Sequence, residues 1–210
     1  MSTTSATEAA RQRDGQFGPQ VRTELDPANA GLGEPEAPPP TWEDALAHAE
    51  VLRGQGVDAS IDEGRRVILI SDADDERHDP DDGTPALQKF YRGGKPELIS
   101  HFTNGELHDP DDRTPAWQTF YPDGTPIWIS HWANGKRSDP ADGTPAWQGF
   151  YPDGTPEWIS HYTNGKLDDP DDGTPAVQEF YSDGTPKWIG HWTNGKLVGE
   201  ESFPPPTGEA

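Results

Sequence analysis

The chain contains no cysteine and few apolar residues. Among its 210 residues there is one methionine, and hydrophobic types make up 30% of the total. Without cysteine there is no disulfide framework and no thiolate for catalysis or metal binding. No segment approaches the run of about 20 apolar residues that a membrane-spanning helix needs, and no apolar leader is visible at the N-terminus. We therefore expect a cytoplasmic protein with no membrane partner.

Basic residues are also scarce. Lysine and arginine total 16 against 38 aspartates and glutamates, which gives a formal net charge of -22. This balance disfavours nucleic acid and anionic membranes as partners, because both carry negative charge. The carboxylates are spread along the chain rather than gathered in one dense block, so mimicry of DNA is also disfavoured. Solubility is the simpler explanation of the charge.

What the chain has in abundance is repetition. Residues 78–197 are one 30-residue unit written four times in succession. A fixed period of about 20–50 residues is typical of stacked supersecondary units, each of which contacts mainly its neighbours. Seven of the eight tryptophans lie in these repeats. A few large aromatic side chains could therefore supply most of the buried area.

The regions outside the repeats divide into three further segments. Residues 1–40 lack helical or strand periodicity and are expected to be a disordered tail. In 41–77 the spacing predicts a helix that begins at Thr41, with Asp44 completing a capping box, and ends at Gly54 and Gly56. A β-hairpin up to residue 70 and an acidic connection should follow, and together they would cap the array. Residues 198–210 are expected to form a loose tail.

Each repeat is predicted to be a β-hairpin, and the second copy shows why. In Pro122-Asp123-Gly124 the proline presets the first turn position and the glycine takes the left-handed one, which gives a three-residue loop with a bulge. That loop pairs Tyr121 with Thr125. Continued along the strands without interruption, the register places Thr119 opposite Ile127, Gln118 opposite Trp128, and Trp117 opposite Ile129.

Two other copies provide a check on this register. At the Thr119 and Ile127 positions, the first copy has Lys89 and Glu97, and the fourth has the same charges in reversed order, Glu179 and Lys187. Opposite charges directly across a strand pair are mildly favourable. An Asn-Gly pair near the end of each copy predicts a second tight turn. The expected fold is mainly β: a single elongated, twisted antiparallel meander of four hairpin repeats with a helix-plus-hairpin cap.

The predicted register places glutamines and aromatic residues together on one face of the sheet. This face is either the packed side of the array or a repeated binding strip that could contact a partner. The candidate binding residues are Gln118, Trp128, Trp132, Gln148, Trp158, Tyr162, Gln178, Trp188 and Trp192.

The repeats resemble the MORN-type repeat, in the variant found in bacterial YwqK-like antitoxins and viral proteins. The matching residues are Asn134-Gly135-Lys136, Gly143 to Ala146, Tyr151, Asp153-Gly154 and Trp158, and the likeness covers about 120 residues. It implies an elongated antiparallel sheet, protein–protein contact and a bacterial or phage-infected host cell. It carries no catalytic residues to this chain. The 30-residue unit is longer than the commonest MORN period, and an acidic DPDDGTP linker fills the difference.

The acidic linkers suggest calcium sites, but their spacing argues against them. Calcium requires about six to eight oxygen ligands, and here no glutamate follows at the bidentate position of a calcium loop. Turn chemistry is therefore the preferred interpretation, because Asp-Pro and Asp-Gly both favour turns. The weak calcium candidates are Asp79, Asp81, Asp109, Asp111, Asp169 and Asp171.

One histidine also recurs in each copy, at positions 101, 131, 161 and 191. Equivalent residues two strands apart lie about 9–10 Å from each other. A zinc ion with ligands at about 2.0–2.1 Å cannot join them. We expect instead a histidine with a hydrogen bond at the end of a strand.

No phosphate-binding loop or catalytic constellation is present, and nearly every distinctive residue occurs once per copy. The leading hypothesis is a non-enzymatic β-repeat module without a cofactor that binds another protein, as an antitoxin-like or phage accessory factor. The first alternative is a binder of glycans or cell-wall ligands that uses the aromatic strip. The second is a structural decoration subunit of a larger particle.

Overall fold

The computed structural model describes residues 40–71, 74, 76–110 and 114–206. The chain divides into two units, 1–32 and 33–210, and every described residue belongs to the second. Several expectations fall outside the described residues: the tail over 1–39, positions 72, 73 and 75 of the acidic connection, the calcium candidate Asp111, and 207–210.

The helix forms where the capping residues predict it. Helix α2 (Trp42–Gly54) follows the N-cap Thr41, whose hydroxyl oxygen accepts the Asp44 amide at 3.3 Å. The Asp44 carboxylate in turn accepts the Thr41 amide at 3.3 Å, which completes the capping box. The helix ends before Gly56, whose φ of 93° is a left-handed conformation that suits glycine. The predicted start and end of the helix are confirmed.

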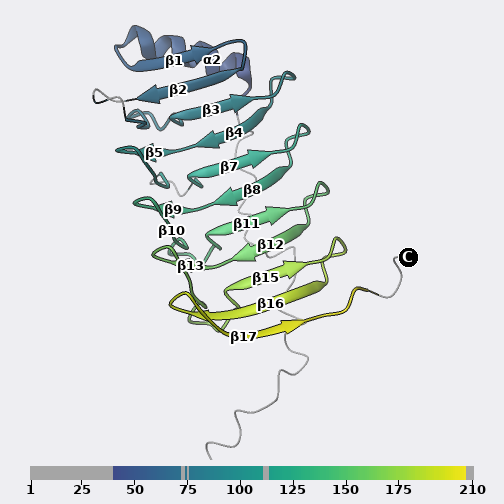
Figure 1. The fold of residues 1–210 in the computed structure, drawn as a ribbon. Helices are drawn as coiled ribbons and strands as arrows, with labels where there is room; N and C mark the ends of the chain where they lie inside the picture. The colour runs from purple at the N-terminus through teal and green to yellow at the C-terminus, as the bar shows by residue number, and fades with distance from the viewer. Residues whose placement is uncertain (1–39, 72–73, 75, 111–113, 207–210) are drawn as a thin grey trace, which may run out of the picture. The chain divides into compact units, whose positions relative to one another are not determined.

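The other elements in the described part of the chain are β-strands, and the prediction of a mainly β antiparallel meander is confirmed. Eleven strands form one sheet in the order β1-β2-β3-β4-β7-β8-β11-β12-β15-β16-β17 (Figure 1). These strands are β1 (Asp58–Asp62), β2 (Val67–Ser71), β3 (Leu87–Phe90), β4 (Pro96–Ser100), β7 (Trp117–Phe120), β8 (Pro126–Ser130), β11 (Trp147–Phe150), β12 (Pro156–Ser160), β15 (Val177–Phe180), β16 (Pro186–Thr193) and β17 (Lys196–Ser202).

Short two-stranded ribbons form in the connections between successive hairpins of the large sheet (Figure 1). They are β5 (Phe102–Thr103) with β6 (Glu106–Leu107), β9 (Trp132–Ala133) with β10 (Lys136–Arg137), and β13 (Tyr162–Thr163) with β14 (Lys166–Leu167). Each turns at an Asn-Gly pair: Asn104 and Gly105 have φ values of 51° and 74°. Positive φ at both central residues is the type I′ pattern that this dipeptide favours, so the predicted second turn is confirmed.

The hairpin loop is as predicted, but the register beyond it is not. The Tyr121 amide donates to the Thr125 carbonyl at 2.8 Å, as the three-residue loop requires. The ladder then pairs Phe120 with Pro126 and Thr119 with Trp128, so Ile127 is an extra residue in a β-bulge. Proline cannot donate to the ladder and is found in strands mainly at edges and bulges, which explains the shift. The predicted pairs of Thr119 with Ile127, Gln118 with Trp128 and Trp117 with Ile129 are therefore wrong.

The bulge changes which residues share a face. Gln118 pairs with Ile129, whereas Trp128 pairs with Thr119 on one side and with Gly149 on the other. The glutamines and the strand tryptophans consequently lie on opposite faces of the sheet. The two ion pairs that supported the earlier register do form, between Lys89 and Glu97 at 2.6 Å and between Lys187 and Glu179 at 2.5 Å. They join across the bulge, where Lys89 itself pairs with Leu98.

Helix α2 buries its apolar side against the first strands of the sheet. The core there contains Trp42 and Leu52 from the helix, Ile68 and Ile70 from β2, and Phe90 from β3. Trp42 and Phe90 meet edge to face, with ring centroids 5.6 Å apart. Among the described residues, no helix is long and apolar enough to cross a membrane.

The far end of the sheet differs from expectation. Residues 198–202 belong to β17 and pair with β16, so the prediction of a loose tail is wrong for them. Trp188 pairs with Ser202 as Trp158 pairs with Glu179. The Tyr181 hydroxyl donates to the Phe203 carbonyl at 3.0 Å, as Tyr151 does to Phe180. Residues 200–203 thus take the place that a first strand takes in a repeat, without the acidic linker.

Candidate functional site

The most prominent surface feature is a row of partly exposed tryptophans on one face of the large sheet. We call it the tryptophan face, and it consists of Trp117, Trp128, Trp147, Trp158 and Trp188. The ring centroids of Trp128 and Trp147 are 5.2 Å apart, and those of Trp147 and Trp158 are 6.3 Å apart. Strands β8, β11 and β12 thus carry one contiguous aromatic surface that water reaches.

Arg137 adds a cation to this aromatic surface. Its guanidinium lies 4.4 Å from the ring centre of Trp147 and 5.0 Å from that of Trp132. It is also 5.9 Å from the ring centre of Tyr162, and its Nε donates to the Ser130 hydroxyl at 3.2 Å. Cations bind to the electron-rich faces of aromatic rings. The side chain therefore links residues of the second and third copies on the tryptophan face.

Two glycines leave room for tryptophan rings to lie against the strands. A Cβ atom on Gly149 would be 2.2 Å from the ring of Trp128, and one on Gly190 would be 2.2 Å from the ring of Trp192. Both distances are far below van der Waals contact. The absence of a side chain at these positions shapes the aromatic surface.

The structure divides the predicted binding strip between two faces. Its strand tryptophans, Trp128, Trp158 and Trp188, lie on the tryptophan face. Trp132 and Tyr162 lie in the ribbons, each with its ring near the Arg137 guanidinium, and the ring centroid of Trp192 is 5.6 Å from that of Trp188. The glutamines face the other way, and Gln148 and Gln178 are each only 3% exposed.

The glutamines have a structural role where their bonds are defined. Gln118 Nε2 donates to the Pro115 carbonyl at 3.5 Å, and Gln88 does the same to Pro85 at 3.2 Å. They hold the end of the acidic linker against the following strand. The sequence prediction also missed Trp117, Trp147 and Arg137. Pro126 was the signal for the bulge that brings Trp128 onto the same face as Trp117.

The first aspartate of each linker is a structural acceptor rather than a metal ligand. Asp139 Oδ1 accepts the backbone amides of Ala146 and Tyr162, both at 2.8 Å. Its Oδ2 lies 2.6 Å from Nδ1 of the buried His161. The same three bonds recur at Asp79, Asp109 and Asp169. The histidines thus have the hydrogen bond that was expected.

The calcium candidates gain no support from this geometry. Oxygens that already accept N–H donors at Asp79, Asp109 and Asp169 are not free for a cation. Later linker aspartates form tight turns: Asp172 Oδ1 accepts the Thr174 amide at 2.9 Å. Within the described ranges, no group of three or more His, Asp or Glu side chains could hold a metal ion.

The hairpin loops contain a similar turn. Asp153 Oδ1 accepts the Thr155 hydroxyl at 2.6 Å and its amide at 2.9 Å, and Asp183 has the same contacts with Thr185. These donors lower the pKa of both carboxyls below the usual value, with the hydroxyl contributing most. The pKa of the Tyr151 phenol is shifted the other way: burial raises it above the usual value.

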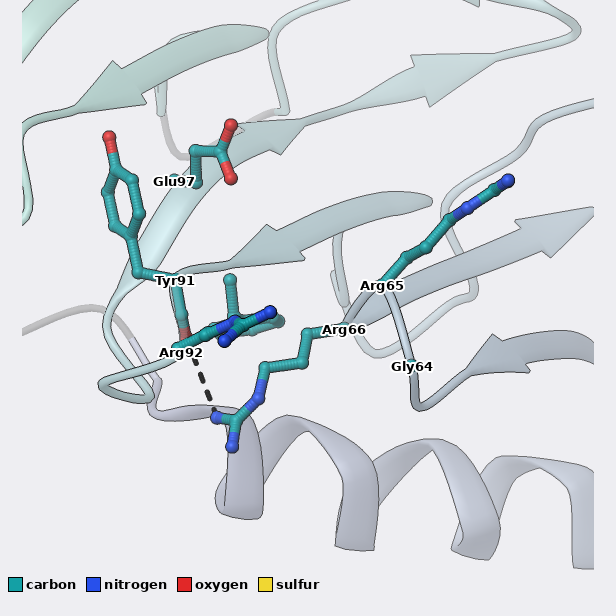
Figure 2. A pocket seen from close by; sticks show the side chains of 7 residues that line it. Gly64, Arg65, Arg66, Tyr91, Arg92 and Glu97 are labelled. Carbon is teal, nitrogen blue, oxygen red and sulfur yellow. Dashed lines mark hydrogen bonds between the residues drawn. The ribbon is translucent and has the colours of Figure 1, made fainter.

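A second feature is an open hollow at the turns that join β1 to β2 and β3 to β4. It encloses about 620 Å³ and is lined by Gly64, Arg65, Arg66, Phe90, Tyr91, Arg92 and Glu97. Figure 2 shows the side chains of Arg66 and Arg92 entering this region from opposite sides beside the start of α2, while Arg65 extends away. Three guanidinium groups against one carboxylate make this lining basic, in contrast to the chain as a whole.

Neither protein-family models nor curated proteins provide a match to this chain. The MORN-type resemblance therefore stays a prediction.

Proposed function

We propose that the chain is a non-enzymatic β-repeat module that binds another protein through the tryptophan face. The carrying observation is the contiguous, partly exposed surface of Trp128, Trp147 and Trp158 with Arg137 beside it. Tryptophan and arginine are the residue types most enriched among the energetically dominant contacts of protein interfaces. Apolar patches on a protein surface commonly mark interaction sites.

The opposite face of the sheet is more deeply buried, which supports the tryptophan face as the one that is free to bind a partner. Phe90, Phe150 and Ile99 there are at most 5% exposed, so that side of the sheet provides the packing. The tryptophans are not needed in every copy, since the first copy has Leu87 and Leu98 at the positions of Trp117 and Trp128. The resemblance to MORN-type repeats supports an antitoxin-like or phage accessory role within this proposal.

The test uses substitutions that the chain itself already contains. Proteins captured by the full chain from its host would be identified and their affinities measured for the wild type and for Trp128→Leu/Trp158→Leu. We expect the double variant to bind at least about 30-fold more weakly, as for a lost interface hot spot of about 2 kcal/mol. Val51→Ala is the control, because Val51 is an apolar side chain on α2 that is 55% exposed.

Unchanged affinity in a double variant with the wild-type circular dichroism spectrum would contradict the proposal. A glycan is the second candidate, because the same half-exposed rings could stack on sugars. Saturable binding of wall oligosaccharides, with a blue shift of tryptophan fluorescence that is lost in the double variant, would favour it over a protein partner.

A further inference from the structure

The hollow between the first two hairpin turns is a candidate ligand site separate from the tryptophan face. Arg66 and Arg92 both line it, from different turns, next to the first turn of α2 (Figure 2). The guanidinium of Arg66 lies 5.8 Å from the ring centre of Trp42 and donates to the Tyr91 carbonyl at 3.5 Å. This neutral acceptor leaves its positive charge uncompensated.

No carboxylate neutralises these two arginines among the described residues. Arg92 has no hydrogen bond or ion pair there, although the chain carries 38 acidic residues. Glu97, the one carboxylate in the lining, is paired with Lys89 at 2.6 Å. Arg65 has only a long contact of 3.8 Å to Asp62, with both side chains at least half exposed. Two guanidinium groups that line one hollow without a counter-charge favour an anion there.

The backbone fixes Arg66 in place. Its φ of 55° is a left-handed conformation that residues other than glycine rarely adopt. Its carbonyl accepts the Phe90 amide at 3.0 Å, so the turn is tied to β3. A strained residue held by its surroundings is a frequent feature of functional sites, where it presets the position of a side chain.

The first repeat departs from the other three at this place. Its turn has Arg92, Gly93 and Lys95 where the second copy has Pro122, Asp123 and Thr125. The changes remove the turn aspartate and add two cations, of which Arg92 lines the hollow and Lys95 instead donates to the Asp123 carbonyl. They occur in the copy whose turn faces Arg66.

We propose that this hollow binds a phosphate monoester through Arg66 and Arg92. The planar guanidinium donates two parallel hydrogen bonds to a phosphoryl group, which offers three acceptor oxygens and up to two negative charges. A compact dianion places its whole charge between the two arginines. An extended polycarboxylate would also meet the acidic surface elsewhere, which disfavours it.

Calorimetric titration of the full chain tests this site. The probes are inorganic phosphate, a phosphoserine peptide, adenosine monophosphate and succinate. Phosphate should bind saturably and succinate should not. Tighter binding of the phosphopeptide would identify a phosphorylated protein as the source, and tighter binding of the nucleotide would identify a free metabolite.

The variants are Arg92→Ser, which copies Ser182 of the fourth repeat, and Arg66→Gly, which suits the left-handed backbone. Each should weaken phosphate binding about tenfold or more, as for a lost charged hydrogen bond. Arg53→Ser is the matched control, because it removes an equal charge from the exposed last turn of α2. Absence of saturable phosphate binding, equal binding of succinate, or equal weakening in all three variants would overturn the proposal. None of these outcomes depends on the tryptophan face.

Discussion

The ring of Trp128 lies directly on Gly149, the residue that pairs with it on β11. A Cβ atom there would be 2.2 Å from ring carbon Cζ3. The other copies have Lys89, Thr119 and Glu179 at this position. The third copy thus gives up a strand side chain, and the tryptophan of the neighbouring repeat occupies the space.

Adding one methyl group to Gly149 should therefore be costly. Gly149→Ala is expected to lower the free energy of unfolding by about 1–3 kcal/mol, the usual cost of overpacking, because the Trp128 ring must move. Gly93→Ala is the control, since a Cβ atom there meets no other atom within 4 Å. Urea unfolding measures both. Equal stability of the two variants would show that Trp128 does not rest on Gly149.

Substitutions of the linker aspartates should affect stability very differently according to their position in the linker. Asp169→Ala removes the acceptor of the Ala176 and Trp192 amides and the partner of His191. We expect it to lower the free energy of unfolding by about 2–5 kcal/mol, since two amides lose their acceptor. Asp171→Ala should change stability by less than about 0.5 kcal/mol, because Asp171 is exposed.

The same two variants, Asp169→Ala and Asp171→Ala, also test whether the linkers bind calcium. If these carboxylates bound calcium, EDTA would lower the melting temperature of the wild type and both substitutions would abolish that effect. We expect no response to EDTA or to added calcium.

Tyrosine hydroxyls connect successive repeats and offer a graded test. Tyr151 donates to the Phe180 carbonyl at 2.8 Å, whereas Tyr121 reaches the Phe150 carbonyl only at 3.5 Å. Tyr151→Phe should lower the free energy of unfolding by about 0.5–1.5 kcal/mol, a typical net hydrogen-bond contribution. Tyr121→Phe should cost clearly less. A larger loss for Tyr121→Phe would contradict the geometry of these links.

The hairpin turns predict a loss of stability in acid. Because the folded-state pKa values of Asp153 and Asp183 lie below the ordinary 3.8, their contribution is present above that pH and disappears as the pH falls through the lowered values. The urea midpoint of the wild type should therefore fall below about pH 4. In Asp153→Asn/Asp183→Asn it should fall less steeply, whereas Asp171→Asn should behave as the wild type. Parallel pH profiles for all three would exclude these turns as the cause.

Local turn and capping chemistry allowed much of the fold to be predicted. Thr41 with Asp44, the Pro-Asp-Gly loops and the Asn-Gly pairs each specify a conformation through neighbouring atoms alone. The bulge at Ile127 was missed because the register was extended past Pro126, although proline in a strand is a signal for a bulge. One extra residue then moved Trp128 to the opposite face.

Other features depend on contacts between distant residues. Strand β17 was missed because Glu200, Glu201 and Ser202 show no apolar alternation; their pairing with β16 makes them a strand. From the sequence alone, Arg137 is expected to be an exposed residue after an Asn-Gly turn. Its contacts with aromatic rings of two repeats are known only from the structure. The hollow could not be predicted because Arg66 and Arg92, which line it, belong to turns that are far apart in the sequence.

The most direct test of the central claim is hydroxyl-radical footprinting of the full chain with and without a captured protein partner. Oxidation of Trp128, Trp147 and Trp158 should fall on binding, while oxidation of Val51 on α2 should stay unchanged. Unaltered oxidation of the three tryptophans in a saturated complex would contradict a role for this face in binding.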